Sequence, residues 1–590
     1  EYEKNVIWDY GEPNGPYTPF DISDELEFRY RFLLNQSAID TRLEQWTSQF
    51  RSYTLSTPVA SGGNELDAWY RRARNDGVYD PNYAYRHIVT THNMDRIINP
   101  AGPTFNNGKM VNVNMADANL LYNAIKAGLL AAEPNYADAN GLAAQLAVNI
   151  VDLRDYDADV TVLPVGSKTY YGFEAQPFIS EVAFRISETD ADVPANNHFA
   201  IELYNPFDAD IPLGDFRLEL RDAAGTVVRT INLAGYAIAD GSRFVITSGS
   251  AASSTFGVTG LMSTGAGKED AALLPAEYDK VPDSDPPAYT LRASYDIYLL
   301  RNKSSSDIYM DKQQTEEAWF DWDAVKNAPQ SYARADNNWN IVYQSASAAS
   351  NTLGTANGVS GSRRNYNLAN SVGSFLSVGD IAKALTVAPS PDPCDMIGFT
   401  LETEPAEGLV RMDLKNPLFT RIFQYLTVMD PATYGRPAYE TRIKGRINVN
   451  TAPWFVIAQL PWMEPAIAER IVTYRETIIG AFESIADLMQ VPEMGYYAYD
   501  PAYASVDLDR FPDLTPSDGA ASDFEERDVI FSRISNLVTV RSDVFTAYIL
   551  VRIGADGPQK RVVAILDRSQ VASPDDKVRI RALHPAPDPR

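Results

Sequence analysis

The sequence predicts an α+β protein of several domains, with two small helical units, a central β-sandwich and a further β-layer. Three observations support this prediction. The chain has 590 residues, more than one hydrophobic core usually serves. An Asn-x-Asn-x-Ala segment occurs twice, at 112–116 and 448–452, and each copy precedes a helical pattern. Between the copies, short apolar stretches alternate with period two and are separated by turn residues.

The expected organisation follows these changes of pattern along the chain. We predict an N-terminal mixed region at 1–107, a first helical unit at 108–176, a β-sandwich at 177–344, a linker and mixed region at 345–439, a second helical unit at 440–496, an acidic linker at 497–526, and C-terminal strands with a tail at 527–590.

The N-terminal region has one clear helical pattern after a Gly-, Pro- and Tyr-rich lead. This pattern covers residues 25–34, with Asp21 or Ser23 as the expected N-terminal cap. No stretch of the chain reaches the roughly 18–20 consecutive apolar residues of a membrane span, and the chain is polar from Glu1 onwards.

Each helical unit is predicted to be a hairpin of two helices. In both copies an Asn or Thr of the Asn-x-Asn-x-Ala segment is available to cap a short helix. A second helical pattern follows at 142–155 in the first copy and at 466–476 in the second, and both contain Ile-Val-x-x-Arg. The shared pattern predicts two related helical hairpins.

The region between the copies is predicted to consist of strands. Alternating apolar stretches occur at 199–204, 216–220, 226–231 and 243–247, and, beyond a polar insertion at about 248–287, at 295–300 and 308–310. Several short strands with regular turns predict a β-sandwich. The chain closes with further strand patterns at 536–540, 545–553 and 561–566, which predict the additional β-layer.

The charge of the chain argues against some classes of partner. Its 51 Lys and Arg residues stand against 78 Asp and Glu residues, so the formal net charge is −27. Such a surface repels phosphate backbones and anionic lipids. We therefore expect no nucleic-acid partner.

Residues typical of catalysis are scarce. The chain has one cysteine, Cys394, and four histidines, which excludes an intrachain disulfide and argues against a zinc site. It has no P-loop, no Gly-x-Ser-x-Gly elbow and no zincin motif. We therefore assign no catalytic and no cofactor-binding residues, and expect a protein that is not an enzyme.

The second helical unit resembles a known module. The resemblance rests on Gly-Arg-Ile-Asn-Val-Asn-Thr-Ala-Pro at 445–453 and on Ala-Phe-Glu-Ser-Ile-Ala-Asp-Leu at 481–488. These runs look like a helix-hairpin-helix (SAM-like) module, which occurs in competence DNA receptors and in the K-type minor pseudopilins of type II secretion. Two such units, with Pro-Phe-Ile-Ser-Glu-Val at 177–182, make the chain similar to the pseudopilins. The resemblance implies that the closing strands form a pilin-like β-layer and that residues 1–107 are a pilin-like or mixed region. It also implies contact with a membrane only through an N-terminal helix that would precede residue 1.

The central sandwich resembles a lamin-tail domain, which is an immunoglobulin-like module. This second resemblance rests on Ile-Glu-Leu-Tyr-Asn-Pro at 201–206 and on Gly241 followed by Phe-Val-Ile at 244–246. An insertion of this kind departs from ordinary K-type pseudopilins. It implies a surface or adhesive specialisation.

A helix-hairpin-helix resemblance also raises the question of DNA binding. Such modules hold phosphate through exposed backbone amides of a Gly-rich hairpin at a helix N-terminus. The hairpin here, Leu-Pro-Trp-Met-Glu-Pro at 460–465, has no glycine and carries an acid where phosphate would lie. Residues 440–495 contain five basic and seven acidic side chains. A packing role for this unit is favoured.

One acidic segment is a candidate metal site. Asp155, Asp157 and Asp159 place three carboxylates at alternate positions after the end of a helix, which suits a hard, oxygen-seeking cation. The spacing is not that of an EF-hand, because Val160 stands where that motif needs glycine. From the residues alone, a solvated acidic turn is the favoured interpretation and a metal site is the alternative. The resemblance implies calcium as well, because K-type pseudopilins bind it in acidic loops.

The expected function is structural. The resemblance implies a non-enzymatic subunit at or near the tip of an extracytoplasmic pseudopilus or pilus-like filament, in the periplasm or at the cell surface of a bacterium. Its expected partners are other pseudopilin or filament subunits, or copies of itself. A self-assembling cell-surface or matrix protein is the alternative, and a DNA-uptake receptor is a further one.

Overall fold

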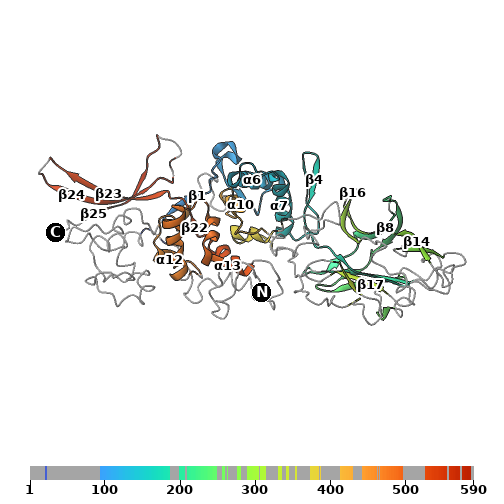
Figure 1. Cartoon of the computed structure of the whole chain (residues 1–590). Coiled ribbons are helices and arrows are strands. Elements are labelled where there is room, and N and C mark those ends of the chain that lie inside the picture. Colours follow the sequence, from blue (N-terminus) through green and yellow to red (C-terminus); the bar gives the residue numbers. More distant parts are fainter. Residues whose placement is uncertain are drawn as a thin grey trace.

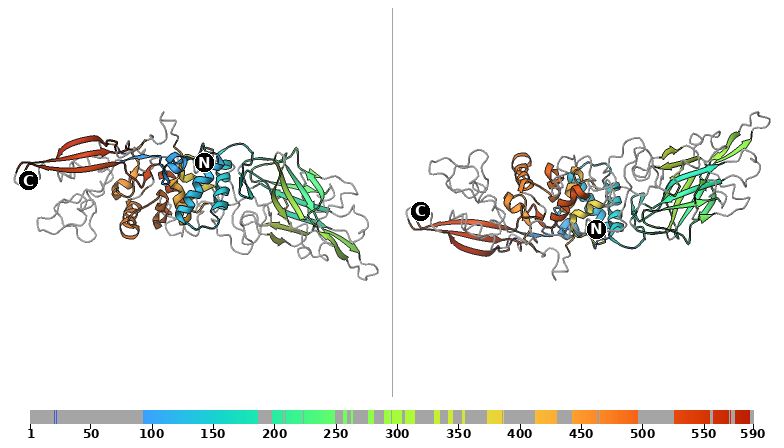
Figure 2. Two further views of the ribbon diagram at one scale, coloured as in Figure 1. Left: turned by 90° about the horizontal axis from the view of Figure 1, so that it is seen from above. Right: turned by 90° about the horizontal axis from the view of Figure 1, so that it is seen from below.

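The structure is a computed structural model of the chain. It describes residues 20, 22, 93–185, 198–205, 207, 209–222, 224–248, 256–258, 262–263, 276–280, 289–294, 296–303, 306–313, 330–334, 341–344, 353–354, 373–384, 386, 412–429, 442–461, 463, 465–495, 525–554, 557–569, 571 and 575–586. These residues form an α+β structure of helices and small sheets along one line, with a helical core in the middle (Figures 1 and 2). None of the helices it describes is long and apolar enough to cross a membrane.

The helical core combines short helices with pairs of short strands. Its α-helices are α6 (Ala118–Ala132), α7 (Ala139–Arg154), α10 (Pro417–Thr420), α11 (Trp454–Ile457), α12 (Pro465–Tyr474) and α13 (Glu525–Ile534). Its 3-10 helices are η2 (Gly102–Thr104), η3 (Asn106–Gly108), η7 (Val378–Lys383), η9 (Arg421–Gln424), η13 (Ile485–Gln490) and η14 (Pro492–Gly495), and η12 (Arg475–Ile479) is a π-helix. Its strands are β1 (Met94–Arg96), β2 (Val111–Asn112), β19 (Leu426–Thr427), β20 (Arg442–Lys444), β21 (Ile447–Asn448) and β22 (Val538–Thr539).

The two Asn-x-Asn-x-Ala segments begin equivalent substructures. β2 pairs in parallel with β19, and β21 pairs in parallel with β22. The amide of Val113 donates to Thr427 O at 2.9 Å, and the amide of Val449 donates to Thr539 O, also at 2.9 Å. In each copy, therefore, a short strand pairs with one that lies far away in the sequence, and two helices follow it.

The second asparagine of each segment does not have the predicted role. Asn114 Nδ2 donates to Phe375 O at 2.9 Å, and its Oδ1 accepts from Phe375 N at 2.8 Å. Asn450 makes the same two bonds with Phe482, both at 2.8 Å. The prediction that an Asn or Thr of this segment caps the next helix is wrong, because Asp117 caps α6 and α11 has no side-chain cap. A side-chain amide can bond both the backbone N–H and the backbone C=O of one residue, so it fixes a distant segment instead.

Each of these distant segments leads into a capped 3-10 helix. Phe-x-Ser-Val-x-Asp at 375–380 forms the start of η7, and Phe-x-Ser-Ile-x-Asp at 482–487 forms the start of η13. Both helices have a capping box, in which the serine and the aspartate satisfy each other's backbone amides. The internal duplication therefore extends beyond the predicted helical hairpins.

The two copies exchange these 3-10 helices. The first repeat consists of residues 111–154, 373–384 and 412–427, and the second repeat of residues 447–495 and 525–539. η7 of the first repeat packs on α13 of the second, and η13 of the second packs on α10 and η9 of the first. η13 also packs on α13 of its own repeat.

Equivalent hydrogen bonds hold each exchanged helix in place. Gln424 Nε2 of the first repeat donates to Glu483 O of the second at 2.7 Å. Asn536 Nδ2 of the second repeat donates to Leu376 O of the first at 2.8 Å. One hydrophobic core spans both repeats, and it includes side chains from 375–384 and 412–426, a region expected to contain linker and mixed structure. The repeats are therefore interlocked and do not form two separate units.

A two-sheet region lies at one end of the helical core. Its six-stranded sheet has the order β12-β11-β6-β5-β17-β18, and its four-stranded sheet has the order β16-β15-β8-β9. The strands are β5 (Phe178–Arg185), β6 (His198–Tyr204), β8 (Phe216–Arg221), β9 (Val227–Asn232), β11 (Arg243–Thr247), β12 (Met262–Ser263), β15 (Asp296–Lys303), β16 (Ser306–Gln313), β17 (Gln330–Arg334) and β18 (Ile341–Gln344). Two-stranded sheets are formed by β3 (Val162–Val165) with β4 (Lys168–Tyr171), β7 (Ile211–Pro212) with β10 (Ala237–Ile238), and β13 (Ala276–Lys280) with β14 (Tyr289–Ser294). The six strands predicted here are confirmed, and the immunoglobulin-like identity of the region stays a prediction.

A buried carboxylate in this region makes its stability depend on pH. Glu202 on β6 accepts from Ser180 Oγ at 2.5 Å and from the amide of Gly354 at 2.5 Å. Burial nevertheless raises the pKa of Glu202 from 4.5 to about 8. Because the folded state holds this proton more tightly than the unfolded state, the stabilisation is complete below pH 4.5 and is lost as the pH rises through about 8.

We therefore expect the thermal unfolding temperature of the two-sheet region to fall between pH 5 and pH 9. The Glu202→Gln variant should show a weaker fall, because its amide does not ionise. Calorimetry across this pH range checks the prediction, with Asp240→Asn in an exposed turn as the control. An equal pH dependence in the wild type and in Glu202→Gln would contradict it.

A three-stranded antiparallel sheet projects from the other end of the core. It consists of β23 (Val544–Arg552), β24 (Gln559–Asp567) and β25 (Arg579–Ala586), in that order. Val544 and Ile565 form a small buried cluster on this sheet, and Ile22 packs against them. Strands are therefore confirmed where the closing pattern predicted them, and their pilin-like identity stays a prediction.

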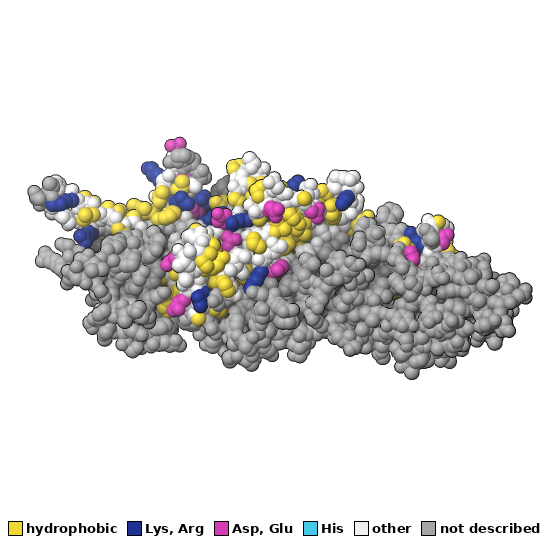
Figure 3. All heavy atoms as spheres, viewed as in Figure 1, with side chains coloured by type: hydrophobic (Ala, Val, Ile, Leu, Met, Phe, Trp, Pro, Cys, Tyr) yellow, Lys and Arg dark blue, Asp and Glu magenta, His cyan; other side chains and the backbone are white. Residues whose placement is uncertain are grey.

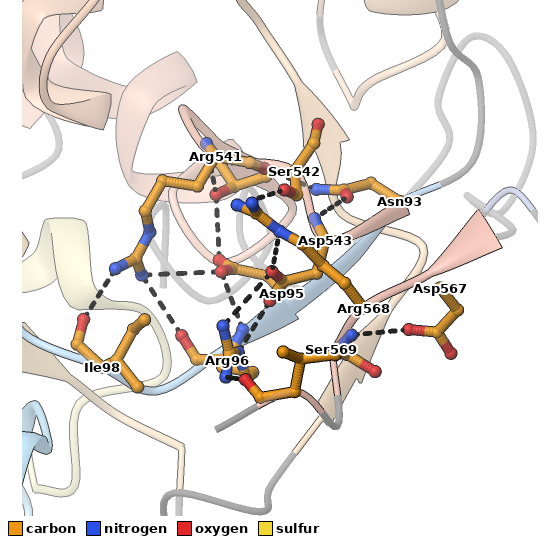
Figure 4. A network of polar contacts seen from close by, with 12 residues as sticks. Asn93, Asp95, Arg96, Ile98, Arg541, Ser542, Asp543, Asp567, Arg568 and Ser569 are labelled. Carbon is orange, nitrogen blue, oxygen red and sulfur yellow. Dashed lines mark hydrogen bonds and ion pairs between the residues drawn. The ribbon is translucent and has the colours of Figure 1, made fainter. Parts of the chain in front are cut away.

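A buried ionic network joins this sheet to the helical core (Figure 4). Asp95 on β1 accepts from Arg446 Nη1 at 3.1 Å and from Thr539 Oγ1 at 2.9 Å. Asp543, just before β23, accepts from Arg96 Nε at 2.8 Å and from Arg568 Nε at 3.1 Å. The contacts of Asp95 join β1 to the helical core, and those of Asp543 join β1 to the base of the three-stranded sheet.

Outside the described residues lie the predicted helix at 25–34, Cys394, and all but the last two residues of the predicted acidic linker at 497–526.

Candidate metal centre

Three carboxylates converge where α7 meets the two-sheet region. Asp155 and Asp157 lie in the loop that follows α7, and Glu174 lies in the segment between β4 and β5. One carboxylate oxygen of each lies within 4.8 Å of the others. Glu174 is buried, Asp155 is half-buried and Asp157 is exposed, so the group opens to solvent on the side of Asp157.

The loop after α7 is shaped by its own polar groups. Arg154 Nη1 donates to Val113 O, which joins the end of α7 to the segment that follows β2. Asp157 Oδ1 accepts from the amide of Asp159 at 2.8 Å and closes a tight turn. Asp159 does not join the three carboxylates of the cluster. The structure therefore unites two of the three predicted ligands and replaces the third with Glu174.

Asp152 supports the cluster from the last turn of α7. It is fully buried, and its Oδ1 accepts from the amide of Thr161 at 3.0 Å. A Cβ at Gly172 would lie 1.9 Å from Asp152 Oδ2, so only glycine allows the chain to pass so close to this carboxylate. This close approach positions Glu174, two residues further along the chain.

The cluster contains buried polar atoms without hydrogen-bond partners. These atoms are Asp155 Oδ1 and Glu174 Oε1. Glu174 has only 1% of its surface exposed, and an unpartnered carboxylate oxygen in that position is costly. A bound cation is one species that would satisfy both oxygens.

The electrostatics of the cluster also favour a positive ion. Burial, together with the neighbouring Asp152 and Asp155, raises the pKa of Glu174 to about 9, although Arg301 opposes this rise. Burial and Asp157 raise the pKa of Asp155 to about 6. Like charges held this close repel each other, so either protons or a cation must offset them at neutral pH.

The donor set fits calcium. Calcium binds carboxylate oxygens at about 2.3–2.6 Å, so two ligands of one ion lie at most about 5 Å apart. The three oxygens, all within 4.8 Å of one another, meet this limit. Asp155, Asp157 and Glu174 would hold the ion, and the open side at Asp157 leaves room for water ligands. The ion would neutralise charge and crosslink the loop, which is a structural role.

We expect the full chain to bind Ca²⁺, and Tb³⁺ in its place, with one site at this cluster. Glu174→Gln should weaken Ca²⁺ affinity by about tenfold or more, because the variant leaves two carboxylates in place of three. Isothermal titration calorimetry and Tb³⁺ luminescence measure this, with Asp240→Asn as the control. Equal affinity in the wild type and in Glu174→Gln would show that calcium binds elsewhere.

Sequence reasoning found this site only in part. The alternating aspartates were visible, because three acids after a helix end form a recognisable pattern. Glu174 was missed, because it is a single acid in the largely apolar run Gly-Phe-Glu-Ala-Gln-Pro at 172–177. An isolated acid within an apolar stretch is the signal that could have marked it.

The helical hairpin of the second repeat is the other candidate site. The amide of Leu460 donates to Ile457 O at 3.0 Å, and the amide of Met463 donates to Leu460 O at 3.1 Å. Both side chains are buried in the core. These two amides are therefore engaged within the protein and are not directed at a phosphate group.

Comparison with known protein families identifies one module. Residues 443–505 match a helix-hairpin-helix motif, which contains α11 and α12 of the second repeat. The prediction of this motif in the second unit is confirmed. No curated protein and no solved structure matched the chain.

Proposed function

We propose that this chain is a structural, non-enzymatic subunit of an extracytoplasmic pseudopilus or pilus-like filament, at or near its tip. The observation that carries the proposal is the interlocked pair of helical repeats. This single core holds a projecting sheet at one end and the two-sheet region at the other (Figure 1). A rigid body between two strand-rich ends suits a subunit that contacts the filament at one end and presents a domain at the other.

The projecting sheet offers a surface for subunit contacts. Phe545, Ile549 and Val551 alternate along β23, so they share one face. Ile580 and Leu583 on β25 lie on the same face of the sheet, because each pairs with a β24 residue whose own partner lies on that face of β23. All five side chains are exposed, and Figure 3 shows hydrophobic side chains with Lys and Arg along this end of the molecule. Exposed apolar faces of this kind mark interaction sites.

The finer assignments belong to the same proposal. A lamin-tail-like, immunoglobulin-like module would account for the two-sheet region, and a pilin-like layer would account for β23–β25. The partners would be other pseudopilins of a type II secretion-like system, in the periplasm or at the cell surface of a bacterium. Calcium at Asp155, Asp157 and Glu174 would be a structural ion.

Electron microscopy of native cell envelopes with gold-labelled antibody against this chain tests the proposal. We expect short filaments with the label at one end only. A repeating array made of this chain alone would contradict the tip assignment, and would favour a self-assembling surface or matrix protein. The exposed apolar face of the projecting sheet is the observation that supports this alternative.

Substitution of a single residue on this sheet face makes the test more specific. Leu583→Glu should remove the chain from labelled filaments without unfolding it, because Leu583 is exposed. Val228→Glu, at an exposed apolar position in the two-sheet region, is the control and should keep the label. Equal labelling of both variants would show that filaments do not use this sheet face.

A DNA-uptake receptor is the less favoured function. The helix-hairpin-helix motif at 443–505 is the observation in its favour. The net charge of −27 and the engaged hairpin amides of Leu460 and Met463 count against it. We expect no binding of duplex DNA at low salt, where electrostatic attraction is strongest. An electrophoretic mobility-shift titration checks this.

A further inference from the structure

The metal cluster lies at the junction between the helical core and the two-sheet region. Asp155 and Asp157 follow α7 directly and belong to the helical side. Glu174 precedes β5, the first strand of the two-sheet region, by only a few residues. A cation held by all three carboxylates would therefore contact both parts of the molecule.

Arg301 reaches the same loop from the opposite direction. It lies on β15, inside the two-sheet region, and is 4% exposed. Its Nη2 donates to Ala158 O, within the acidic loop, at 2.6 Å. Its Nη1 has no hydrogen-bond partner, and its guanidinium group lies 5.0 Å from the centre of the Phe216 ring. The contact of Arg301 thus joins the acidic loop to the two-sheet region, although this loop directly follows α7.

The segment that carries Glu174 is itself fixed on both sides. Gly172 packs against Asp152 of α7, which leaves no room for a side chain. Phe173 contacts Phe207 of the two-sheet region, with ring centres 6.0 Å apart. Glu174 lies directly after this pair of contacts, so its carboxylate has little freedom to leave the junction.

The geometry points to a cation-dependent latch between the helical core and the two-sheet region. A divalent, oxygen-binding cation such as Ca²⁺ joins Asp155 and Asp157 to Glu174, and Arg301 locks the same loop to β15. With the cation bound, the two-sheet region has one orientation relative to the core. Without it, no ion joins Asp155 and Asp157 to Glu174, and the two-sheet region has a wider range of orientations relative to the core. This inference rests on the calcium site of the proposed function.

Double electron–electron resonance on the full chain tests the latch. Spin labels are placed at Asn119→Cys on α6 and Val228→Cys on β9, both at exposed positions, and Cys394 is changed to serine. We expect a narrow distance distribution in Ca²⁺ and a broader one in EDTA. Calorimetric Ca²⁺ titration of the same labelled protein shows independently whether the ion binds.

Two variants separate ion binding from the latch. Glu174→Gln should keep the broad distribution at Ca²⁺ concentrations that saturate the wild type. Arg301→Met should bind Ca²⁺ with an affinity of the same order as the wild type and yet keep a broad distribution, because the loop is no longer tied to β15. Asp240→Asn is the control and should behave as the wild type.

The outcomes separate the two ideas. If the wild type binds Ca²⁺ but its distance distribution does not narrow, the latch is wrong and the calcium site stands. If the wild type binds no Ca²⁺, both the calcium site and the latch are wrong. Narrowing in the wild type, together with its loss in Glu174→Gln and Arg301→Met, supports the latch.

Discussion

Asp95→Ala is expected to cost about 3–5 kcal/mol of the free energy of unfolding of the helical core, because it leaves a buried arginine without its counter-charge. Asp95 is 3% exposed and faces Arg446, which is 9% exposed. Although burial raises the pKa of Asp95, Arg541 and Arg446 together with its hydrogen bonds hold this pKa below its usual value. The carboxylate is therefore ionised in the folded protein, and the charges around it depend on it.

Urea unfolding of the full chain, followed by fluorescence and circular dichroism, measures this cost. Glu133→Ala, an exposed acid at the end of α6, is the matched control and should change stability little. The double variant with Arg446→Met should lose less than the sum of the two single variants, because the buried charge is then removed as well. A cost for Asp95→Ala no larger than that for Glu133→Ala would show that the network in Figure 4 does not hold the core together.

The second large effect is expected at the contact between the repeats. Phe423 of η9 and Phe531 of α13 meet edge to face with ring centres 5.4 Å apart, and both are buried. Phe531→Ala should cost about 3–5 kcal/mol through the cavity it leaves. Because the repeats share one core, we expect both repeats to lose stability equally, although Phe531 belongs to the second repeat alone.

Hydrogen exchange of two equivalent amides tests this expectation. Val113 N reports on the first repeat and Val449 N on the second, since each donates to the partner strand of its own repeat. Phe531→Ala should lower the protection of both amides to the same extent. Phe545→Ala, at a ring that is 44% exposed on the projecting sheet, is the control. A loss of protection at Val449 alone would mean that the repeats unfold independently.

Local patterns identified much of the fold. Alternating stretches marked strands such as β6 and β11, because a half-buried strand has period two. The repeated Asn-x-Asn-x-Ala segment marked the duplication and the helix-hairpin-helix motif of the second repeat. The second echo, at 375–380 and 482–487, was equally present in the sequence. It was missed because the two-sheet region separates it from the first repeat.

The sequence also suggested a wrong role for the asparagines of the two segments. Asparagine before a helix is a common cap, so the local prediction followed a sound rule. In the structure, Asn114 and Asn450 instead bind backbone groups of Phe375 and Phe482. A polar side chain bonds with whichever group the tertiary structure brings near it, and that group was more than thirty residues away in the second repeat and far more in the first.

By itself, the sequence determined the α+β fold class, the duplicated helical motif, most strand positions and the acidic loop at Asp155 and Asp157. These features depend on periodicity and on short-range spacing, which are local properties of the chain. Only the tertiary structure decided the exchange of η7 and η13, the single core shared by the repeats and the position of Glu174 beside the loop. Those features depend on which distant segments pack together, and packing is set by shape and burial over the whole core.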